Sequence, residues 1–352
     1  MIKPGRATAI ILYLLALVAM PVLGNTGILL VVNKSDNTLS LLNLATAHSI
    51  AVLPTGTGPH EVAVSPDGTI ALVSNYGAAS EPGNSLTVIN IAAAEVVDTI
   101  DLGDYRRPHG LVWLPDNRRA LVTVEDNRAV VLVDINHGEI IRAVKTGESV
   151  SHMVAIDPAG NRAYVANIGS GSISVIDIDG GVLRATVNVG KGTEGIAMSP
   201  DSKQLWATNR ESDTVVVIDP ATMNILATLD STGFPIRVIL SPDGREALVS
   251  RANASRVEFY DTQTLQSSGE VSMPREYSLS NGRWLGGGFG YRPLPIGIVY
   301  HPDGKTAYVA NSYGGYIAVV DVATRQVTAT LQAGAEPDGM AHSHVMPLTD
   351  NE

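Results

Sequence analysis

One short pattern recurs seven times along the chain, and this repetition constrains the fold more than any single residue does. Its clearest copies are Tyr164–Asp177 (YVANIGSGSISVID) and Tyr308–Asp321 (YVANSYGGYIAVVD). One place in the pattern, here called the Asn place, is occupied in turn by Asn33, Asn75, Val124, Asn167, Asn209, Arg251 and Asn311. The successive intervals are 42, 49, 43, 42, 42 and 60 residues. A period of this length with several short strands per unit is typical of a β-propeller.

Each unit contains four segments with the composition of β-strands. In the unit that spans residues 59–102, these segments are Glu61–Val64, Ile70–Ser74, Leu86–Ile91 and Val96–Ile100. They are rich in Val and Ile, and a Pro-Asp-Gly turn separates the first from the second. The four segments predict one four-stranded antiparallel blade per unit.

The two ends of the chain supply different parts of a unit. The turn after the first strand occurs six times for seven units, because the chain begins with a strand of the second type at 28–32 and ends with a strand of the first type at 338–342. Pairing these ends would close the ring and cover an exposed sheet edge. The sequence therefore predicts an all-β, seven-bladed propeller whose first blade combines residues 338–345 with 28–53.

The first 24 residues have the pattern of a secretory signal peptide. Lys3 and Arg6 precede the apolar run Ala9–Met20, and Gly24 offers a small residue for cleavage before Asn25. An uncleaved anchor is the alternative, but the run is short for a membrane span. We expect a signal peptide at 1–24, a propeller at 25–352, no stable membrane span after cleavage, and a periplasmic or secreted location.

Charge and cysteine content exclude several function classes. The formal net charge is −11, which argues against nonspecific nucleic-acid binding because that requires a basic surface. The chain has no cysteine, so disulfides, thiolate metal sites and cysteine nucleophiles are all absent. Stability must come from packing and strand pairing. We expect a monomer, as is common for closed rings.

The Tyr-Val-Ala-Asn and Ser-Pro-Asp-Gly elements resemble those of the YVTN family of β-propeller repeat proteins, which includes YncE-like and surface-layer-type members. The resemblance covers nearly the whole mature chain, although Val124 and Arg251 depart from it at the Asn place. It implies an extracytoplasmic seven-bladed propeller, and related propellers include lactonases and haem d1-binding domains. These motifs specify strands and turns, so they say little about function.

The residues at the entrances of the first strands carry the strongest chemical signal. In circular order they are Asp338, His60, His109, His152, Glu194, Ile236 and Ile296. Because the first strands of a propeller line its channel, these residues should form one ring at one face. Three imidazoles and two carboxylates together suit one divalent transition metal, namely Zn, Fe, Mn, Cu or Ni. The alternative is that the histidines only hydrogen-bond the backbone of neighbouring blades.

Two further features flank this ring. Arg107, Arg237 and Arg251 are expected on the same face, where guanidinium groups could bind a carboxylate or phosphate. The long insertion 273–294 contains three consecutive glycines together with Trp284 and Tyr291, which suggests a lid with aromatic contact area. The alternatives are arginines paired with local acids and a loop packed on the rim.

Two functions fit these observations. The first is a binding or scaffold protein that presents its face to a small anionic ligand or a protein partner, with Arg237, Arg251, Arg107, Trp284 and Tyr291 as binding residues. The second is a metal-dependent enzyme, such as a lactonase, lyase or oxidoreductase. Its metal ligands would be His60, His109 and His152, with Glu194 or Asp338 as a further ligand or base.

Overall fold

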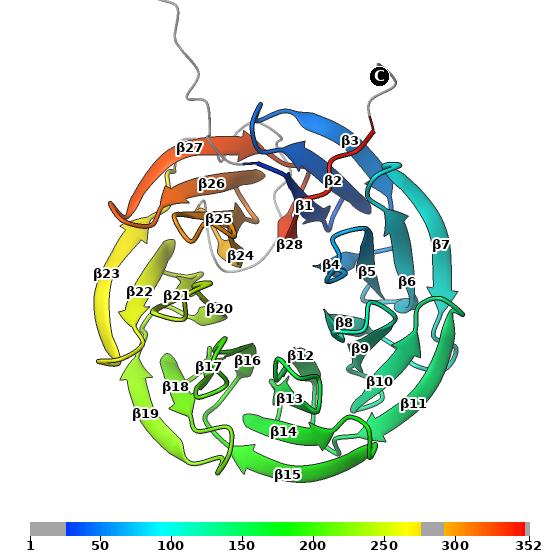
Figure 1. Ribbon diagram of the computed structural model, residues 1–352. Helices are drawn as coiled ribbons and strands as arrows, with labels where there is room; N and C mark the ends of the chain where they lie inside the picture. Colours follow the sequence, from blue (N-terminus) through cyan, green and yellow to red (C-terminus); the bar gives the residue numbers. More distant parts are fainter. Residues whose placement is uncertain (1–25, 276–291, 349–352) are drawn as a thin grey trace, which may run out of the picture.

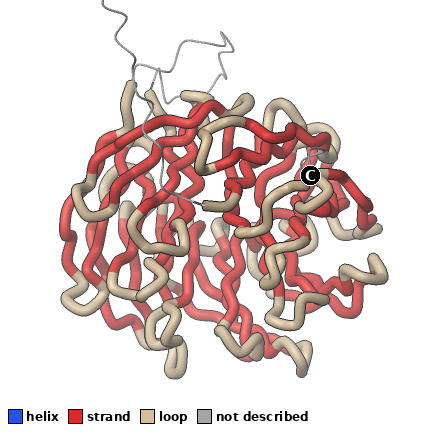
Figure 2. The backbone as a smooth tube through the Cα atoms, turned by 45° about the horizontal axis from the view of Figure 1, so that its top comes forward, coloured by secondary structure: helices blue, strands red, loops and turns tan. Residues whose placement is uncertain are grey.

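A computed structural model describes residues 26–275 and 292–348. These residues form seven four-stranded antiparallel sheets arranged as blades around a central channel (Figure 1). The tilted view shows strands joined by short loops, and no helix occurs in the described part of the chain (Figure 2). The predicted all-β, seven-bladed propeller is thereby confirmed.

Blades 1 to 7 are numbered here from the one that joins the two chain ends. In that order, the innermost strands are β28 (Pro337–Ser343), β4 (Pro59–Val64), β8 (Pro108–Trp113), β12 (Ser151–Ile156), β16 (Thr193–Met198), β20 (Pro235–Leu240) and β24 (Pro295–Tyr300). The second strands are β1 (Ile28–Asn33), β5 (Ile70–Gly77), β9 (Arg119–Val124), β13 (Arg162–Asn167), β17 (Leu205–Asn209), β21 (Glu246–Arg251) and β25 (Thr306–Asn311). The third strands are β2 (Thr38–Asn43), β6 (Pro82–Asn90), β10 (Ala129–Asp134), β14 (Ser172–Asp177), β18 (Thr214–Ile218), β22 (Arg256–Asp261) and β26 (Tyr316–Asp321). The outermost strands are β3 (Ser49–Pro54), β7 (Glu95–Asp101), β11 (Glu139–Lys145), β15 (Val182–Asn188), β19 (Ile225–Asp230), β23 (Gln266–Ser272) and β27 (Gln326–Gln332).

The hydrophobic core lies between neighbouring blades. Leu72 and Val88 of blade 2, for example, pack in one cluster with Trp113 and Val122 of blade 3. The second and third strands have both faces covered, so they are almost completely buried and read as continuous apolar runs. The outermost strands have one face in solvent and are mostly exposed or partly exposed, as in β3 and β7. The fold thus distributes its apolar burial evenly around the ring.

Blade 1 closes the ring as the sequence predicted. Strand β28 pairs antiparallel with β1, in a register that places Ser343 opposite Ile28 and Ala341 opposite Leu30. The chain ends therefore contribute the innermost strand and the three outer strands of one sheet. In the part of the chain that the structure describes, no helix is long and apolar enough to cross a membrane.

One hydrogen bond is repeated in all seven blades and shows that the repeats are rotationally equivalent. The backbone N–H of the residue after the Asn place donates to the carbonyl two residues before the entrance residue, at 2.9 to 3.2 Å. The donors are Lys34, Tyr76, Glu125, Ile168, Arg210, Ala252 and Ser312. The acceptors are Glu336, Gly58, Arg107, Val150, Gly192, Phe234 and Leu294. This bond fixes the start of each inner strand against the end of the second strand.

The approach to the channel uses an unusual backbone conformation. Six of the seven acceptor residues have positive φ, between 54° and 70°, and four of these six carry side chains: Arg107, Val150, Phe234 and Glu336. A non-glycine residue in this region is strained, by roughly 1–2 kcal/mol. The turn directs the following residues toward the axis, and this placement costs the fold some stability.

Candidate functional site

The residues at the second place of each inner strand form the entrance ring, which consists of Asp338, His60, His109, His152, Glu194, Ile236 and Ile296. All seven are buried or partly buried, although five of them are ionisable. Buried ionisable groups are costly unless they are paired, so their partners indicate what the site can do.

The three histidines of the entrance ring meet at the mouth of the channel. The imidazole centroids of His109 and His152 are 3.6 Å apart, and those of His60 and His109 are 5.1 Å apart. The Tyr76 ring lies 4.4 Å from that of His60. Three neighbouring blades thus bring their imidazoles together, as expected from their equivalent positions in the repeat.

A second set of residues surrounds the entrance ring and was not anticipated from the sequence. It is the flanking ring, formed by the residues directly after the Asn place: Lys34, Tyr76, Glu125, Ile168, Arg210, Ala252 and Ser312. Three of its members bind the entrance ring or one another. The repeat pattern could have predicted this ring, because the position next to the Asn place also recurs once per blade.

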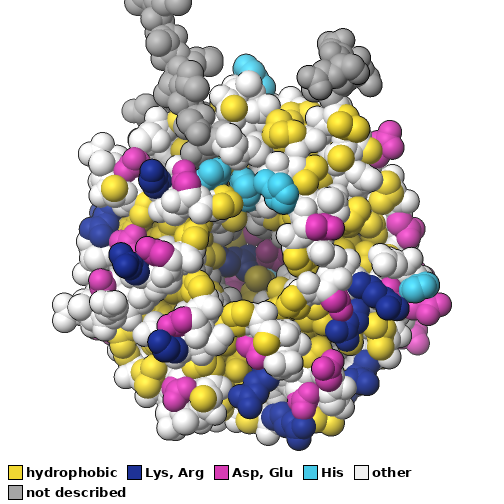
Figure 3. All heavy atoms as spheres, viewed as in Figure 1, with side chains coloured by type: hydrophobic (Ala, Val, Ile, Leu, Met, Phe, Trp, Pro, Cys, Tyr) yellow, Lys and Arg dark blue, Asp and Glu magenta, His cyan; other side chains and the backbone are white. Residues whose placement is uncertain are grey.

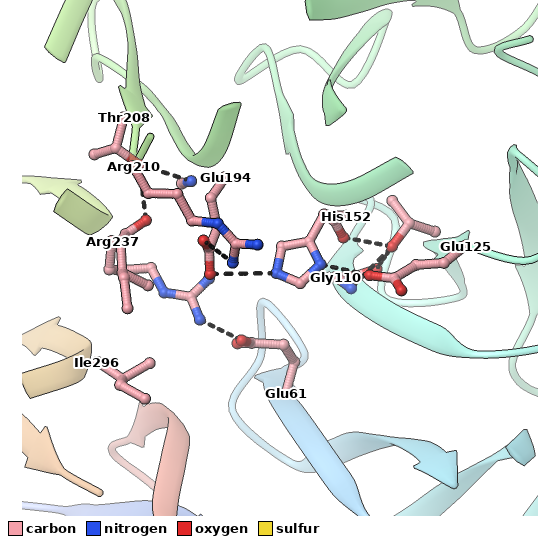
Figure 4. A network of polar contacts seen from close by, with 12 residues as sticks. Glu61, Gly110, Glu125, His152, Glu194, Thr208, Arg210, Arg237 and Ile296 are labelled. Carbon is pink, nitrogen blue, oxygen red and sulfur yellow. Dashed lines mark hydrogen bonds and ion pairs between the residues drawn. The ribbon is translucent and has the colours of Figure 1, made fainter. Parts of the chain in front are cut away.

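A continuous chain of polar contacts links the two rings (Figure 4). The Tyr76 hydroxyl donates to Glu125 Oε2 at 2.6 Å, and Glu125 Oε1 lies 2.5 Å from His152 Nδ1. The other ring nitrogen of His152, Nε2, lies 3.6 Å from Glu194 Oε1. Arg210 Nη1 donates to Glu194 Oε2 at 2.7 Å. His152 is therefore held between two carboxylates, and each of them has a further partner.

These surroundings separate the pKa values of the three histidines. Burial lowers the pKa of His152, but the hydrogen bonds and negative charges of Glu125 and Glu194 outweigh it and raise the value to about 9. Burial lowers the pKa of His60 to about 4, although Asp338 opposes the shift. Burial also lowers the pKa of His109 well below its usual range, and the positive charge of His152 adds to this. At neutral pH, one charged imidazole thus stands beside two neutral ones.

The two carboxylates of the entrance ring differ in their pairing. Burial raises the pKa of Glu194, but the hydrogen bond and charge of His152 and the charge of Arg210 reverse the shift, so this carboxyl stays ionised. Asp338 is buried, and its negative charge acts on His60 and on Glu61. Glu194 therefore has cationic partners on both sides, whereas Asp338 acts through its electrostatic field.

One residue further along the inner strands, an ion pair crosses the channel. Arg237 Nη2 of blade 6 donates to Glu61 Oε1 of blade 2, and both side chains are about nine-tenths buried. The equivalent places in four other blades are glycines: Gly110, Gly195, Gly297 and Gly339. A Cβ on any of these glycines would collide with a carbonyl of the next inner strand. These glycines therefore allow the inner strands of neighbouring blades to approach closely around the channel that the ion pair crosses.

One end of the channel is visible in the space-filling view (Figure 3). A central hollow lies inside the ring, and acidic and basic side chains are seen at its floor. Arg237 has a second nitrogen, Nη1, which is buried and has no hydrogen-bond partner among the described residues. The charge of Arg237 also reaches His109, whose pKa it lowers.

The other predicted binding residues lie further from the imidazoles or outside the described residues. Arg251 Nη1 lies 3.3 Å from Glu258, and its Nη2 donates to Glu270. Arg107 lies over the Tyr76 ring, 4.9 Å from its centroid, and 3.5 Å from an oxygen of Asp126. The predicted contacts of Trp284 and Tyr291, and the predicted lid that contains them, lie outside the described residues.

The environment of Arg251 explains its departure from the repeat. In blade 1, the side chain of Asn33 donates to the Ser40 hydroxyl, seven residues later, at 2.8 Å. In blade 6, Arg251 stands at the Asn place, and Glu258 stands seven residues later. A polar amide–hydroxyl pair has been replaced by an ion pair at the same two positions. This observation favours a structural role for Arg251.

Comparisons with known proteins agree with this architecture. The model of the YNCE-like β-propeller family matches residues 3–119. No curated protein matched the chain. Hydrazine synthase of Kuenenia stuttgartiensis has a similar solved structure, with a TM-score of 0.70 and 19% identity over 88% of this chain and 99% of that one.

A functionally unknown protein from Desulfotomaculum acetoxidans is also similar, with a TM-score of 0.74 and 15% identity over 91% of this chain and 99% of that one. At these identities, the two solved structures support the fold alone. The family match covers the first blades, and the same repeat continues around the closed seven-bladed ring. The match to the YNCE-like β-propeller family over residues 3–119, together with the seven-bladed ring, supports a YncE-like propeller protein.

Proposed function

We propose that the protein is an extracytoplasmic binding propeller that holds a small anionic ligand at the mouth of its channel. The single observation that carries this proposal is the state of Arg237. Its guanidinium group is buried, one nitrogen pairs with Glu61, and Nη1 has no acceptor within the described ranges. A buried donor without an acceptor costs about 1–3 kcal/mol. A carboxylate or phosphate oxygen at this point would remove that cost.

Neighbouring donors support an anionic ligand over a neutral one. His109 Nδ1 and Arg210 Nε are also buried without a partner among residues 26–275 and 292–348. Three acidic groups of the site, Glu125, Glu194 and Glu61, have hydroxyl or cationic partners, and the fourth, Asp338, acts on its neighbours through its charge. The unused hydrogen-bonding capacity at the mouth is therefore mainly that of N–H donors and the imidazole of His109. Directional donors of this kind favour a ligand with several oxygen acceptors.

Binding of small anions is the direct test. The mature protein would be titrated with a panel of carboxylates and phosphates, with affinity measured by calorimetry and by the shift in melting temperature. We expect at least one anion to bind, and Arg237→Met to weaken it at least tenfold. The matched control is Arg118→Met, because Arg118 is exposed and pairs with Asp134 on the rim. Equal affinity in Arg237→Met and wild type, or no binding by wild type, would refute the proposal.

The extracytoplasmic location rests on the signal-peptide pattern of residues 1–24. We expect the protein isolated from cells to begin at Asn25 and to be found outside the cytoplasm as a monomer. Amino-terminal sequencing, cell fractionation and light scattering would measure this. A mature chain that retains Met1 in the cytoplasmic fraction would contradict it.

A metal-dependent enzyme is the second candidate. It is favoured by the stacking of neutral His109 on His152, which places acid/base groups of different pKa next to each other. Lactones are a suitable first panel, assayed with and without Zn²⁺ or Mn²⁺. We expect His152→Gln to abolish any turnover found, and turnover unaffected by this change would exclude the site as its source.

A further inference from the structure

We propose that His109, Glu125 and His152 form a binding site for one divalent transition metal ion. One ligand atom from each residue lies within 4.8 Å of those of the other two. Two histidines and a carboxylate form a ligand set that zinc, cobalt, nickel and iron all accept. The proposal does not depend on the anionic ligand proposed above.

The first argument is that two of the three ligands already have outer partners. Metal-bound histidines usually donate their second ring nitrogen to a carboxylate, and metal-bound carboxylates are themselves hydrogen-bonded. His152 Nε2 faces Glu194, which is held by Arg210 at 2.7 Å. Glu125 Oε2 accepts the hydroxyl of Tyr76 at 2.6 Å. The two remaining atoms, His152 Nδ1 and Glu125 Oε1, hydrogen-bond each other at 2.5 Å, and a metal ion would bind them by replacing the proton that they share.

The second argument comes from His109. Its side chain is about 95% buried, and its Nδ1 has no hydrogen-bond partner among the described residues. Its ring lies 3.6 Å from that of His152, and one nitrogen of each ring belongs to the group of ligand atoms that lie within 4.8 Å of one another. A buried imidazole with an unused nitrogen beside a histidine–carboxylate pair is the arrangement expected of an incomplete coordination sphere.

His60 differs from these three residues. Its Nδ1 lies 2.8 Å from the carbonyl oxygen of Gly58, and its ring centroid is 5.1 Å from that of His109. It does not belong to the group of converging ligand atoms, whereas Glu125 does. The proposed ligand set is therefore two histidines and a glutamate, in place of the three-histidine set expected from the sequence.

The chemistry of the ligands restricts the metal and its role. Two nitrogen ligands disfavour Ca²⁺ and Mg²⁺, which prefer oxygen. Three protein ligands leave at least one position open in a tetrahedral site. That position would take water or an oxygen of a bound anion. The ion would thus add a positive charge next to His109, on which the positive charge of Arg237 also acts.

The test is a titration with Co²⁺, which reports coordination through its visible absorption. Protein prepared without a histidine tag would be stripped with a chelator and titrated with Co²⁺ alone, and the bound Co²⁺ would then be displaced with Zn²⁺. We expect one equivalent to bind with the intense bands of a low-coordinate site. His109→Ala and Glu125→Gln should abolish these bands, and Tyr76→Phe should weaken affinity about tenfold through the outer partner.

Two histidine variants provide matched controls. His60→Ala tests the three-histidine alternative at the same mouth, and His301→Ala tests a buried histidine that contacts Thr26 elsewhere. Both should bind Co²⁺ as the wild type does. The proposal fails if wild type binds no Co²⁺, or if His60→Ala loses the bands while Glu125→Gln keeps them. Anion binding measured in chelator tests the proposed function separately, and circular dichroism shows whether each variant is folded.

Discussion

The ion pair that crosses the channel offers a quantitative test of how the hub is stabilised. Glu61→Met and Arg237→Met each leave one buried charge without its main partner, and the double variant removes both charges while keeping similar volume. Breaking a buried pair costs about 3–5 kcal/mol, whereas replacing both partners by apolar residues is often nearly neutral. The double variant should therefore be more stable than either single variant.

The structure also ranks the two single variants. Arg237 is attracted by Glu61, Asp338 and Glu194, so Glu61→Met leaves it with two carboxylates nearby. Glu61 is attracted chiefly by Arg237 and is repelled by Asp338. Arg237→Met should therefore cost more than Glu61→Met. For a ring of roughly 300 folded residues, with an unfolding entropy of about 2.1 cal/mol/K per residue, a loss of about 4 kcal/mol lowers the melting temperature by about 6 °C.

The effect of pH gives an independent check on the same pair. Burial raises the pKa of Glu61, and the charge of Arg237 opposes that shift. In Arg237→Met the pKa of Glu61 should rise further. A carboxyl with a raised pKa in the folded state destabilises it increasingly as pH rises above the unfolded value of 4.5. The loss of unfolding free energy in Arg237→Met relative to wild type should therefore be larger at pH 7.5 than at pH 4.5.

The assay is denaturant unfolding of wild type, both single variants and the double variant, with calorimetry for the melting temperatures. A coupling energy below about 0.5 kcal/mol, which is the size of ordinary non-additivity between independent sites, would refute the reasoning. So would a double variant that is less stable than Arg237→Met. Either result would mean that the pair contributes no more than its separate side chains.

Three further predictions concern other parts of the ring. Arg251→Asn should destabilise the protein by about 2 kcal/mol, because it leaves Glu258 buried without its cation. Adding Glu258→Ser should recover most of that loss, because it restores the amide–hydroxyl pair of blade 1. Denaturant unfolding of both variants measures these changes. Gly110→Ala should cost about 1–3 kcal/mol, because the new Cβ would lie 2.5 Å from the carbonyl oxygen of His152, and an unchanged melting temperature would contradict the close approach of these strands. The guanidinium of Arg118 lowers the pKa of Asp134 to about 2, so this carboxylate stabilises the fold above pH 3.8 and the stabilisation is lost as pH falls through 2. Asp134→Asn should therefore be less stable than wild type above pH 3.8, and acid unfolding should show this difference shrinking as pH falls toward 2.

The fold could be predicted almost completely from the sequence, for a physical reason. Each repeat buries its faces only against its neighbours, so the same strand and turn residues must recur in every blade. The count of six turns for seven units also gave the closure of blade 1, because β28 and β1 come from opposite ends of the chain. The meeting of His109 and His152 followed from their equivalent places in the repeat.

The site was predicted less completely, because its partners depend on side-chain reach. Glu125 stands after Val124, where the repeat departs from its usual residue, and its role is visible only when His152 of the next blade is placed beside it. The pairing of Arg237 with Glu61 joins residues 176 positions apart, across the channel. Repeat position determines which blade a residue belongs to, but it does not determine how far its side chain extends toward the axis.

The joining of β28 to β1 has a consequence for how the protein comes into being. The partners in that sheet are separated by about 300 residues, so the ring stays open until the last strand has been synthesised. Before that moment, the two blades beside the gap each have one apolar side uncovered. The nascent chain must therefore avoid aggregation through these apolar surfaces until β28 is available to pair with β1, and only then can the ring close.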